Sequence, residues 1–98
     1  MRYFFVYIMT NYLNTVLYIG VTSTLKNRVS EHREGFKSTF CSKYKCHKLV
    51  YFEMHDDILF AIQREKRIKR WKRKWKENLI NNMNPEWKDL FDQIQHLD

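Results

Sequence analysis

Two short apolar runs near the start of the chain constrain its fold more than any other feature of the sequence. Residues 3–9 and 15–21 are rich in aromatic and β-branched side chains and show no regular polar alternation. Runs of this kind are typical of strands that are covered on both faces. Residues 11–14 between them form a polar segment suited to a turn, and the sequence therefore predicts a β-hairpin.

The length of the turn decides which residues of the two strands face each other. With a four-residue loop at 11–14, Tyr7 would lie directly opposite Tyr18 on the same face of the sheet. Directly opposed side chains stand about 4.5–5.5 Å apart at Cβ, so the two phenols would form a pair. Taken alone, such a pair is more commonly ordinary sheet packing, and a functional interpretation needs further residues.

A helix is predicted over about residues 25–34, directly after the second strand. The hydroxyl residues at 22–24 are suitable N-caps, and Leu25 and Val29 have the spacing that faces a core. Arg28 and His32 form a second i, i+4 pair beside them, which places a guanidinium near an imidazole. By itself, such a pair is commonly part of a solvated helix face.

Residues 35–48 are polar and basic, with three aromatic side chains interleaved among the cations. Positive charge beside aromatic rings suits a phosphate backbone with exposed bases, although a surface loop with aromatics tucked beneath it would look similar. The candidate nucleic-acid-binding residues here are Lys37, Lys43 and Lys45. Residues 49–54 then indicate a third strand, in which Glu53 is either a metal ligand or a solvated residue of the strand edge.

The longest helical pattern extends over about residues 58–80, and nine of the 18 basic residues fall within 64–76. Glu65 interrupts the apolar stripe of this helix, and a carboxylate directed toward a core is costly unless it is paired or binds a metal. Lys69, one turn further on, is the alternative partner. Arg67 and Arg70 are further candidates for nucleic-acid binding. The apolar stripe consists of Ala61, Ile62, Ile68, Trp71, Trp75 and Leu79.

A short amphipathic helix over about residues 85–96 is predicted to close the chain, because Pro85 stands at a favourable first helical position. With 98 residues the chain has room for one domain. We assign this domain to residues 1–98, with its core over about residues 2–82.

The chain carries 18 Lys and Arg against 11 Asp and Glu, a formal net charge of +7. This balance favours a polyanionic partner such as nucleic acid, or an anionic membrane surface, although a basic protein without such a partner would share it. No run approaches the roughly 20 apolar residues of a membrane span, and residues 3–9 are too short for a signal-peptide core. We therefore expect no membrane segment and a cytoplasmic protein. Cys41, Cys46 and His47 are weak grounds for zinc, and reduced thiols are the better interpretation.

Five of these polar residues, taken in order, resemble the catalytic positions of the GIY-YIG nuclease family. Residues 6–8 (Val-Tyr-Ile) and 18–20 (Tyr-Ile-Gly) resemble the paired motif that names the family, although the leading glycine of its first half is absent. Arg28 and His32 are similar to the second motif, and Glu65 corresponds to the metal-binding glutamate. The resemblance covers nearly the whole chain and extends to the small stand-alone bacterial members. The catalytic domains of the excision-repair incision subunit and of homing endonucleases are also similar.

The resemblance implies an α+β fold, with a small three-stranded antiparallel sheet flanked by helices. It implies a metal-dependent endonuclease that hydrolyses phosphodiester bonds in DNA, in repair or recombination intermediates. The cofactor would be one Mg²⁺ or Mn²⁺ ion held by Glu65, while Arg28 would donate to phosphate oxygens. Tyr7 and Tyr18 would position or deprotonate the attacking water, with His32 as the alternative proton acceptor. The asparagine that assists in some members has four candidates here, namely Asn78, Asn81, Asn82 and Asn84.

Two other functions stay open on the sequence alone. The first is a non-catalytic or partner-dependent nucleic-acid-binding module with the same fold, although the presence of all five site residues argues against a loss of catalysis. A protein-interaction adaptor using Trp71, Trp75 and Trp87 is the second alternative, and it would lack salt-dependent DNA affinity. DNA is the expected nucleic acid. The expected assembly is a monomer or a weak homodimer, and the predicted function leaves room for a protein partner that directs the chain to its target.

Overall fold

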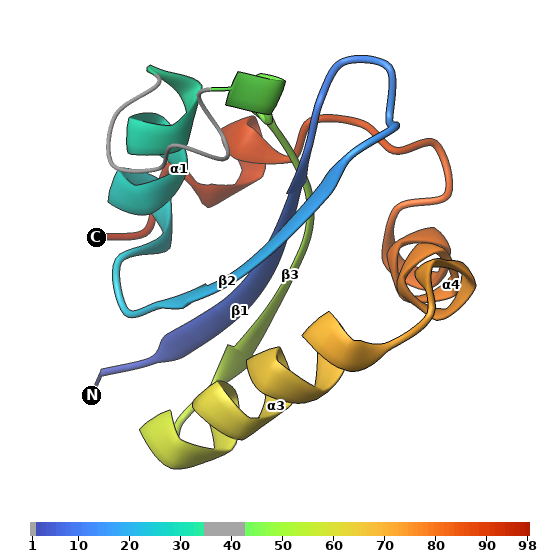
Figure 1. Cartoon of the computed structure of the whole chain (residues 1–98). Coiled ribbons are helices and arrows are strands. Elements are labelled where there is room, and N and C mark those ends of the chain that lie inside the picture. Colours follow the sequence, from blue (N-terminus) through green and yellow to red (C-terminus); the bar gives the residue numbers. More distant parts are fainter. Residues whose placement is uncertain (1, 35–42) are drawn as a thin grey trace.

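In the computed structural model, which describes residues 2–34 and 43–98, a three-stranded sheet lies between two layers of helix (Figure 1). This arrangement confirms the predicted α+β fold with a small antiparallel sheet. The elements in chain order are β1 (Phe4–Thr10), β2 (Leu17–Thr22), α1 (Leu25–Arg33), β3 (Lys48–His55), α3 (Ile58–Arg70), α4 (Arg73–Met83) and the 3₁₀ helix η1 (Phe91–Ile94).

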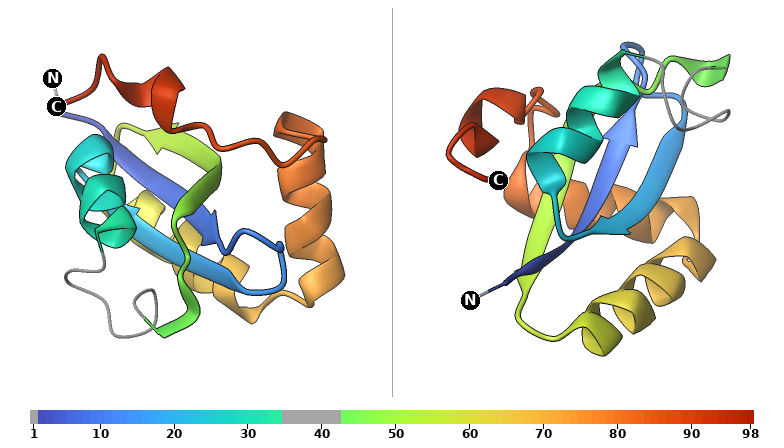
Figure 2. Two further views of the ribbon diagram at one scale, coloured as in Figure 1. Left: turned by 90° about the horizontal axis from the view of Figure 1, so that it is seen from above. Right: turned by 90° about the vertical axis from the view of Figure 1, so that its left-hand side faces the viewer.

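β1 is the central strand, and β2 and β3 pair with it in antiparallel fashion on either side. Its side chains from Phe5 to Thr10 are all buried, because α1 and η1 cover one face of the sheet while α3 and α4 cover the other (Figure 2). Burial on both faces explains the lack of polar alternation in this run. The α1 side of the core contains Phe5, Tyr7, Met9, Leu25, Val29, Leu49, Leu90 and Ile94, and the α3 side contains Val6, Ile8, Ile19, Val50, Ala61, Ile68 and Ile80.

The register of the β1–β2 hairpin differs from the prediction by two residues. Tyr7 faces Gly20, and Tyr18 faces Met9, so the two tyrosines are diagonal neighbours on one face rather than direct partners. The loop between the strands has six residues instead of four, because the side chain of Asn11 organises it. Asn11 Oδ1 accepts hydrogen bonds from the backbone N–H groups of Thr15 at 2.8 Å and Val16 at 3.0 Å.

The single helix predicted over about residues 58–80 is wrong, because the chain breaks at Trp71 and Lys72. Both residues have extended backbone, with ψ values of 151° and 150°. Trp71 is half-buried against the α3 side of the core, and the guanidinium carbon of Arg64 lies over its ring, 5.2 Å from the ring centroid. The break redirects α4 so that Ile80 becomes buried, while Trp75, which was assigned to the apolar stripe, is 54% exposed.

The amphipathic helix predicted over about residues 85–96 is also wrong. Asn84 to Trp87 form a turn, and only Phe91–Ile94 form a short 3₁₀ helix. The segment before it lies along β3, where the Leu90 N–H donates to the Leu49 carbonyl at 2.7 Å. This tertiary hydrogen bond satisfies a backbone group that a helix would otherwise have used. Leu90 and Ile94 are nevertheless buried, as the apolar spacing predicts.

None of the described helices is long and apolar enough to cross a membrane.

Candidate active site and nucleic-acid-binding surface

The structure brings Tyr7 of β1 and His32 of α1 together inside the molecule. The Tyr7 hydroxyl lies 2.9 Å from His32 Nε2, at hydrogen-bond distance, and each residue is only 1% exposed. His32 occurs one turn after Val29 on the buried stripe of α1, so the helix directs its imidazole at the central strand. The alternative interpretation of His32 as part of a solvated helix face is therefore wrong.

Tyr18 of β2 completes an aromatic triad with these two residues. Its ring centroid lies 5.0 Å from that of His32 and 6.3 Å from that of Tyr7. Unlike the other two, Tyr18 is only partly buried. Tyr18 is thus the member of the triad whose side chain meets solvent.

Arg28 lies one turn before His32 on α1, with its side chain 41% exposed. Its Nε atom is 3.3 Å from Glu31 Oε1, at ion-pair distance, yet it makes no hydrogen bond within the described residues. His32 Nδ1 is likewise buried without a hydrogen-bond partner in that part of the chain. Two polar nitrogens therefore keep unused hydrogen-bonding capacity beside the triad, and buried nitrogens of this kind are uncommon in folded proteins.

Glu65 lies on α3, on the other side of the sheet from α1. Its side chain is 12% exposed, and its Oε2 atom lies 3.4 Å from Lys69 Nζ. The alternative partner considered from the sequence is thus present, but Lys69 itself is 54% exposed, and such pairs on a helix surface are worth only a few tenths of a kcal/mol. A weakly held, sheltered carboxylate is suited to binding a cation.

A divalent ion is compatible with this donor set only if water and substrate supply most of its ligands. Among residues 2–34 and 43–98 no group of three or more His, Cys, Asp or Glu side chains is arranged to hold a metal. Mg²⁺ meets this condition, since it commonly keeps several waters and is bound through one or two carboxylates and substrate phosphates. Glu65 fits such a role. Cys46, part of the weak zinc alternative, is buried in the core, and Cys41 lies outside the described residues.

Glu53 does not fit a metal-binding role, and it is not a solvated edge residue either. Its side chain is 16% exposed, and Arg64 Nε donates to both its oxygens, at 3.0 and 3.3 Å. The Tyr51 hydroxyl and His55 Nε2 also lie 2.5 Å from its carboxylate. Burial disfavours the charged form, but the hydrogen bonds from Arg64, Tyr51 and His55 outweigh this effect and lower the pKa of Glu53. The carboxylate is already saturated with protein donors.

Two of the four candidate asparagines are occupied by structural hydrogen bonds. Asn84 is buried, its Nδ2 donates to the carbonyls of Val50 and Lys88, and its Oδ1 accepts from the Lys88 N–H. Asn81 Oδ1 accepts from Trp87 Nε1 at 2.6 Å. Asn78 and Asn82 instead line a shallow pocket beside Trp71 and Trp75.

The basic residues proposed to contact nucleic acid fall on two separate surfaces. Lys43 and Lys45 are exposed at the short helical turn before β3, near the hairpin loop and the end of α1 (Figure 1). Arg67 and Arg70 line a second surface on α3, on the other side of the sheet. Lys37 lies outside the described residues.

Two residues of the site were missed in the sequence. Glu31 could have been found from its i, i+3 spacing to Arg28, which places opposite charges side by side on a helix. Gly20, which faces Tyr7 in the observed register, was assigned only to a motif, because the expected loop length placed a different residue opposite Tyr7.

The sequence of the chain is similar to those of known proteins. Residues 3–78 match the family model described as the GIY-YIG catalytic domain, and this span includes the tyrosines, Arg28, His32 and Glu65. The chain is 35% identical over 71 residues to a UPF0213 protein of Syntrophus aciditrophicus (strain SB), a match that covers 71% of this chain and 80% of that protein. No solved structure matches the chain significantly.

Proposed function

The chain belongs to the GIY-YIG catalytic domain family, and from this premise we propose that it is a divalent-metal-dependent endonuclease. Its substrate is DNA, in repair or recombination intermediates, and its reaction is hydrolysis of a phosphodiester bond. The observation that carries the proposal is the buried hydrogen bond between the Tyr7 hydroxyl and His32 Nε2, 2.9 Å long, beside the partly exposed Tyr18. A packing role alone does not require an imidazole whose Nδ1 has no hydrogen-bond partner among the described residues.

The triad supports transfer of a proton away from an attacking water. Tyr18 is the member that meets solvent, so its hydroxyl positions the water against the phosphate. Imidazole is the side chain that most readily exchanges a proton near neutral pH. Because His32 is 1% exposed, it acts through the tyrosines rather than on the water directly. Tyr7 holds the imidazole in place through its hydroxyl.

Arg28 and Glu65 supply the charges that the phosphate requires. The guanidinium of Arg28 is 41% exposed, and its planar set of N–H donors matches phosphate oxygens. Glu65 would hold the divalent ion through its carboxylate. When bound, Mg²⁺ or Mn²⁺ polarises the phosphate and stabilises the leaving oxygen.

The proposal is tested by cleavage of a labelled panel of duplex, single-stranded, flap and junction DNA, with RNA alongside. We expect products with Mg²⁺ or Mn²⁺, none with EDTA, and none from Glu65→Ala, which should keep its affinity for DNA. Glu86→Ala is the matched control, because Glu86 is 68% exposed and pairs only with Lys88 among the described residues. Unchanged cleavage by Glu65→Ala would overturn the metal site. If the wild-type protein binds DNA in a salt-sensitive manner but cuts nothing, the protein is a binding module instead.

A further inference from the structure

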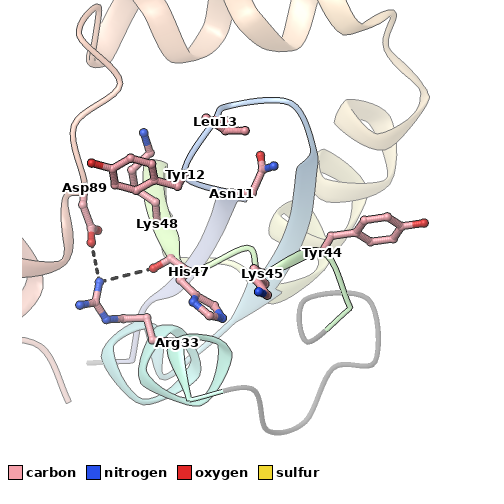
Figure 3. A pocket seen from close by; sticks show the side chains of 9 residues that line it. All are labelled: Asn11, Tyr12, Leu13, Arg33, Tyr44, Lys45, His47, Lys48 and Asp89. Atoms are coloured by element: carbon pink, nitrogen blue, oxygen red, sulfur yellow. Dashed lines mark hydrogen bonds and ion pairs between the residues drawn. The ribbon is translucent and has the colours of Figure 1, made fainter.

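A pocket of about 560 Å³ lies at the loop end of the β1–β2 hairpin, outside the catalytic triad (Figure 3). The hairpin loop forms one wall, the end of α1 forms another, and the segment before β3 lies between them. The volume falls within the range of pockets that hold small ligands, about 300–1,000 Å³. The lining residues are Asn11, Tyr12, Leu13, Arg33, Tyr44, Lys45, His47, Lys48 and Asp89.

The hairpin loop presents two apolar side chains to solvent at the mouth of this pocket. Tyr12 is 90% exposed and Leu13 is 76% exposed. A tyrosine ring offers a large, rigid contact surface with few torsions to fix when it is bound. Neither residue contributes to the core, so packing does not explain why this turn carries them.

The loop that carries these two residues is stabilised by hydrogen bonds from a side chain within the loop and from a side chain of α4. Asn11 bonds to the backbone of Thr15 and Val16 within the loop. From α4, Arg73 donates to the carbonyls of Thr15 at 2.7 Å and Asn14 at 2.8 Å. Tyr12 and Leu13 are therefore displayed on a fixed backbone, and less ordering is required when a ligand binds.

The charges around the pocket favour an anion. Arg33 and Asp89 form an ion pair with each other, and Arg33 also donates to the His47 carbonyl (Figure 3). Lys45 and Lys48 have no ion-pair partner within the described residues and remain to bind an anionic group. An aromatic ring beside uncompensated cations is the combination that binds a base together with its phosphate.

We propose that this pocket holds one unpaired nucleotide of the DNA substrate, with its base stacked on Tyr12 and its phosphate bound by Lys45 and Lys48. The inference rests on the proposed nuclease function and specifies its substrate, namely DNA with an unpaired strand next to the cut. Bases within a duplex are already stacked on one another, so an exposed ring contributes mainly to binding of unpaired ones.

The pocket is close enough to the triad to hold the same strand. Arg33, in its wall, directly follows His32 on α1. Asn11, at its rim, directly follows β1 and is four residues after Tyr7, which corresponds to about 13 Å of extended chain. The scissile phosphate and the unpaired nucleotide are therefore neighbouring parts of one DNA strand.

The test uses the full chain carrying Glu65→Gln, in EDTA, so that binding is measured without cutting. Fluorescence anisotropy gives the affinity for an oligo(dT) strand and for a blunt duplex, in the parent and in Tyr12→Ala, Tyr12→Phe and Tyr3→Ala. Tyr3 is the matched control, an exposed tyrosine outside the pocket. We expect Tyr12→Ala to weaken single-strand binding at least fivefold, since stacking contributes about 1–3 kcal/mol per base. Duplex binding should change less than twofold, and Tyr12→Phe, which keeps the ring, should bind like the parent.

Lys48→Gln tests the phosphate contact independently. It should lower the slope of log affinity against log salt for the single strand by about 0.7. An unchanged ratio of single-strand to duplex affinity in Tyr12→Ala, with the melting temperature retained, would overturn the inference even if the wild-type protein cuts DNA. By contrast, if the wild-type protein neither binds nor cuts DNA, the proposed nuclease function itself is contradicted.

Discussion

Gly20 provides the space that the phenol of Tyr7 occupies. The two residues are direct partners in the β1–β2 register, and a Cβ atom at Gly20 would lie 2.5 Å from both the Cζ and the hydroxyl oxygen of Tyr7. This separation is far below van der Waals contact. The missing side chain on β2 is therefore what allows the tyrosine hydroxyl on β1 to reach His32.

Gly20→Ala should move the Tyr7 ring and break its hydrogen bond to His32. Overpacking of a buried site costs about 1–3 kcal/mol, and we expect the rate of DNA cutting to fall at least tenfold. Urea unfolding and single-turnover cleavage measure the two effects. In a Tyr7→Phe background the additional loss of activity from Gly20→Ala should be smaller, because both changes remove the same hydroxyl contact. Wild-type activity in Gly20→Ala would contradict this account.

Tyr7→Phe and Tyr18→Phe should separate stability from activity. Removing the Tyr7 hydroxyl leaves both ring nitrogens of His32 buried without a partner in the described structure, at a cost of about 1–3 kcal/mol in the free energy of unfolding. Tyr18 is partly exposed, so Tyr18→Phe should cost about 0.5 kcal/mol or less. We expect both variants to cut slowly, as measured under single-turnover conditions. If the two variants lose the same free energy of unfolding, the buried hydrogen bond between Tyr7 and His32 does not contribute more to stability than the Tyr18 hydroxyl.

The Glu53 cluster should make the protein less stable in acid. Because the pKa of Glu53 is lowered below 4.5 in the folded state, its contribution is complete above that pH. The contribution is lost as the pH falls through the lowered value. Urea unfolding between about pH 7 and about pH 3 should show this slope, and Glu53→Gln should reduce it. Glu34→Gln removes the same charge at an exposed position, and this variant should retain the wild-type dependence of the free energy of unfolding on pH.

Asn84→Ala should destabilise the connection between α4 and β3. The buried Asn84 amide makes three hydrogen bonds, to the carbonyls of Val50 and Lys88 and from the Lys88 N–H. Their loss should lower the free energy of unfolding by about 2 kcal/mol or more, as measured by urea unfolding. Asn82→Ala is the control, since Asn82 is exposed, and an equal loss in that variant would contradict the structural role of Asn84.

The sequence by itself determined the three strands, the helix α1 that follows the second strand, and the family of the chain. The three apolar runs form the three strands. They could be predicted because the burial of a strand is set by the residue types at consecutive positions. Leu25 and Val29 were correctly placed on the buried face of α1, because helical spacing is equally local. The family resemblance was found in the same way, from residue types at fixed spacing.

Only the tertiary structure decided the hairpin register, the helix break and the free or occupied state of each polar group. The six-residue loop is stabilised by Arg73, which is 58 residues away from Thr15 in the sequence. The break at Trp71 and Lys72 carries no proline or glycine that would predict it, and it follows from the packing of Trp71 on the sheet side of α3. Glu53 and Glu65 are both glutamates near a core. Four donor atoms of Arg64, Tyr51 and His55 bind the carboxylate of Glu53, whereas the described residues give Glu65 one ion-pair partner, Lys69. Such differences depend on contacts between distant segments, and local sequence patterns do not contain them.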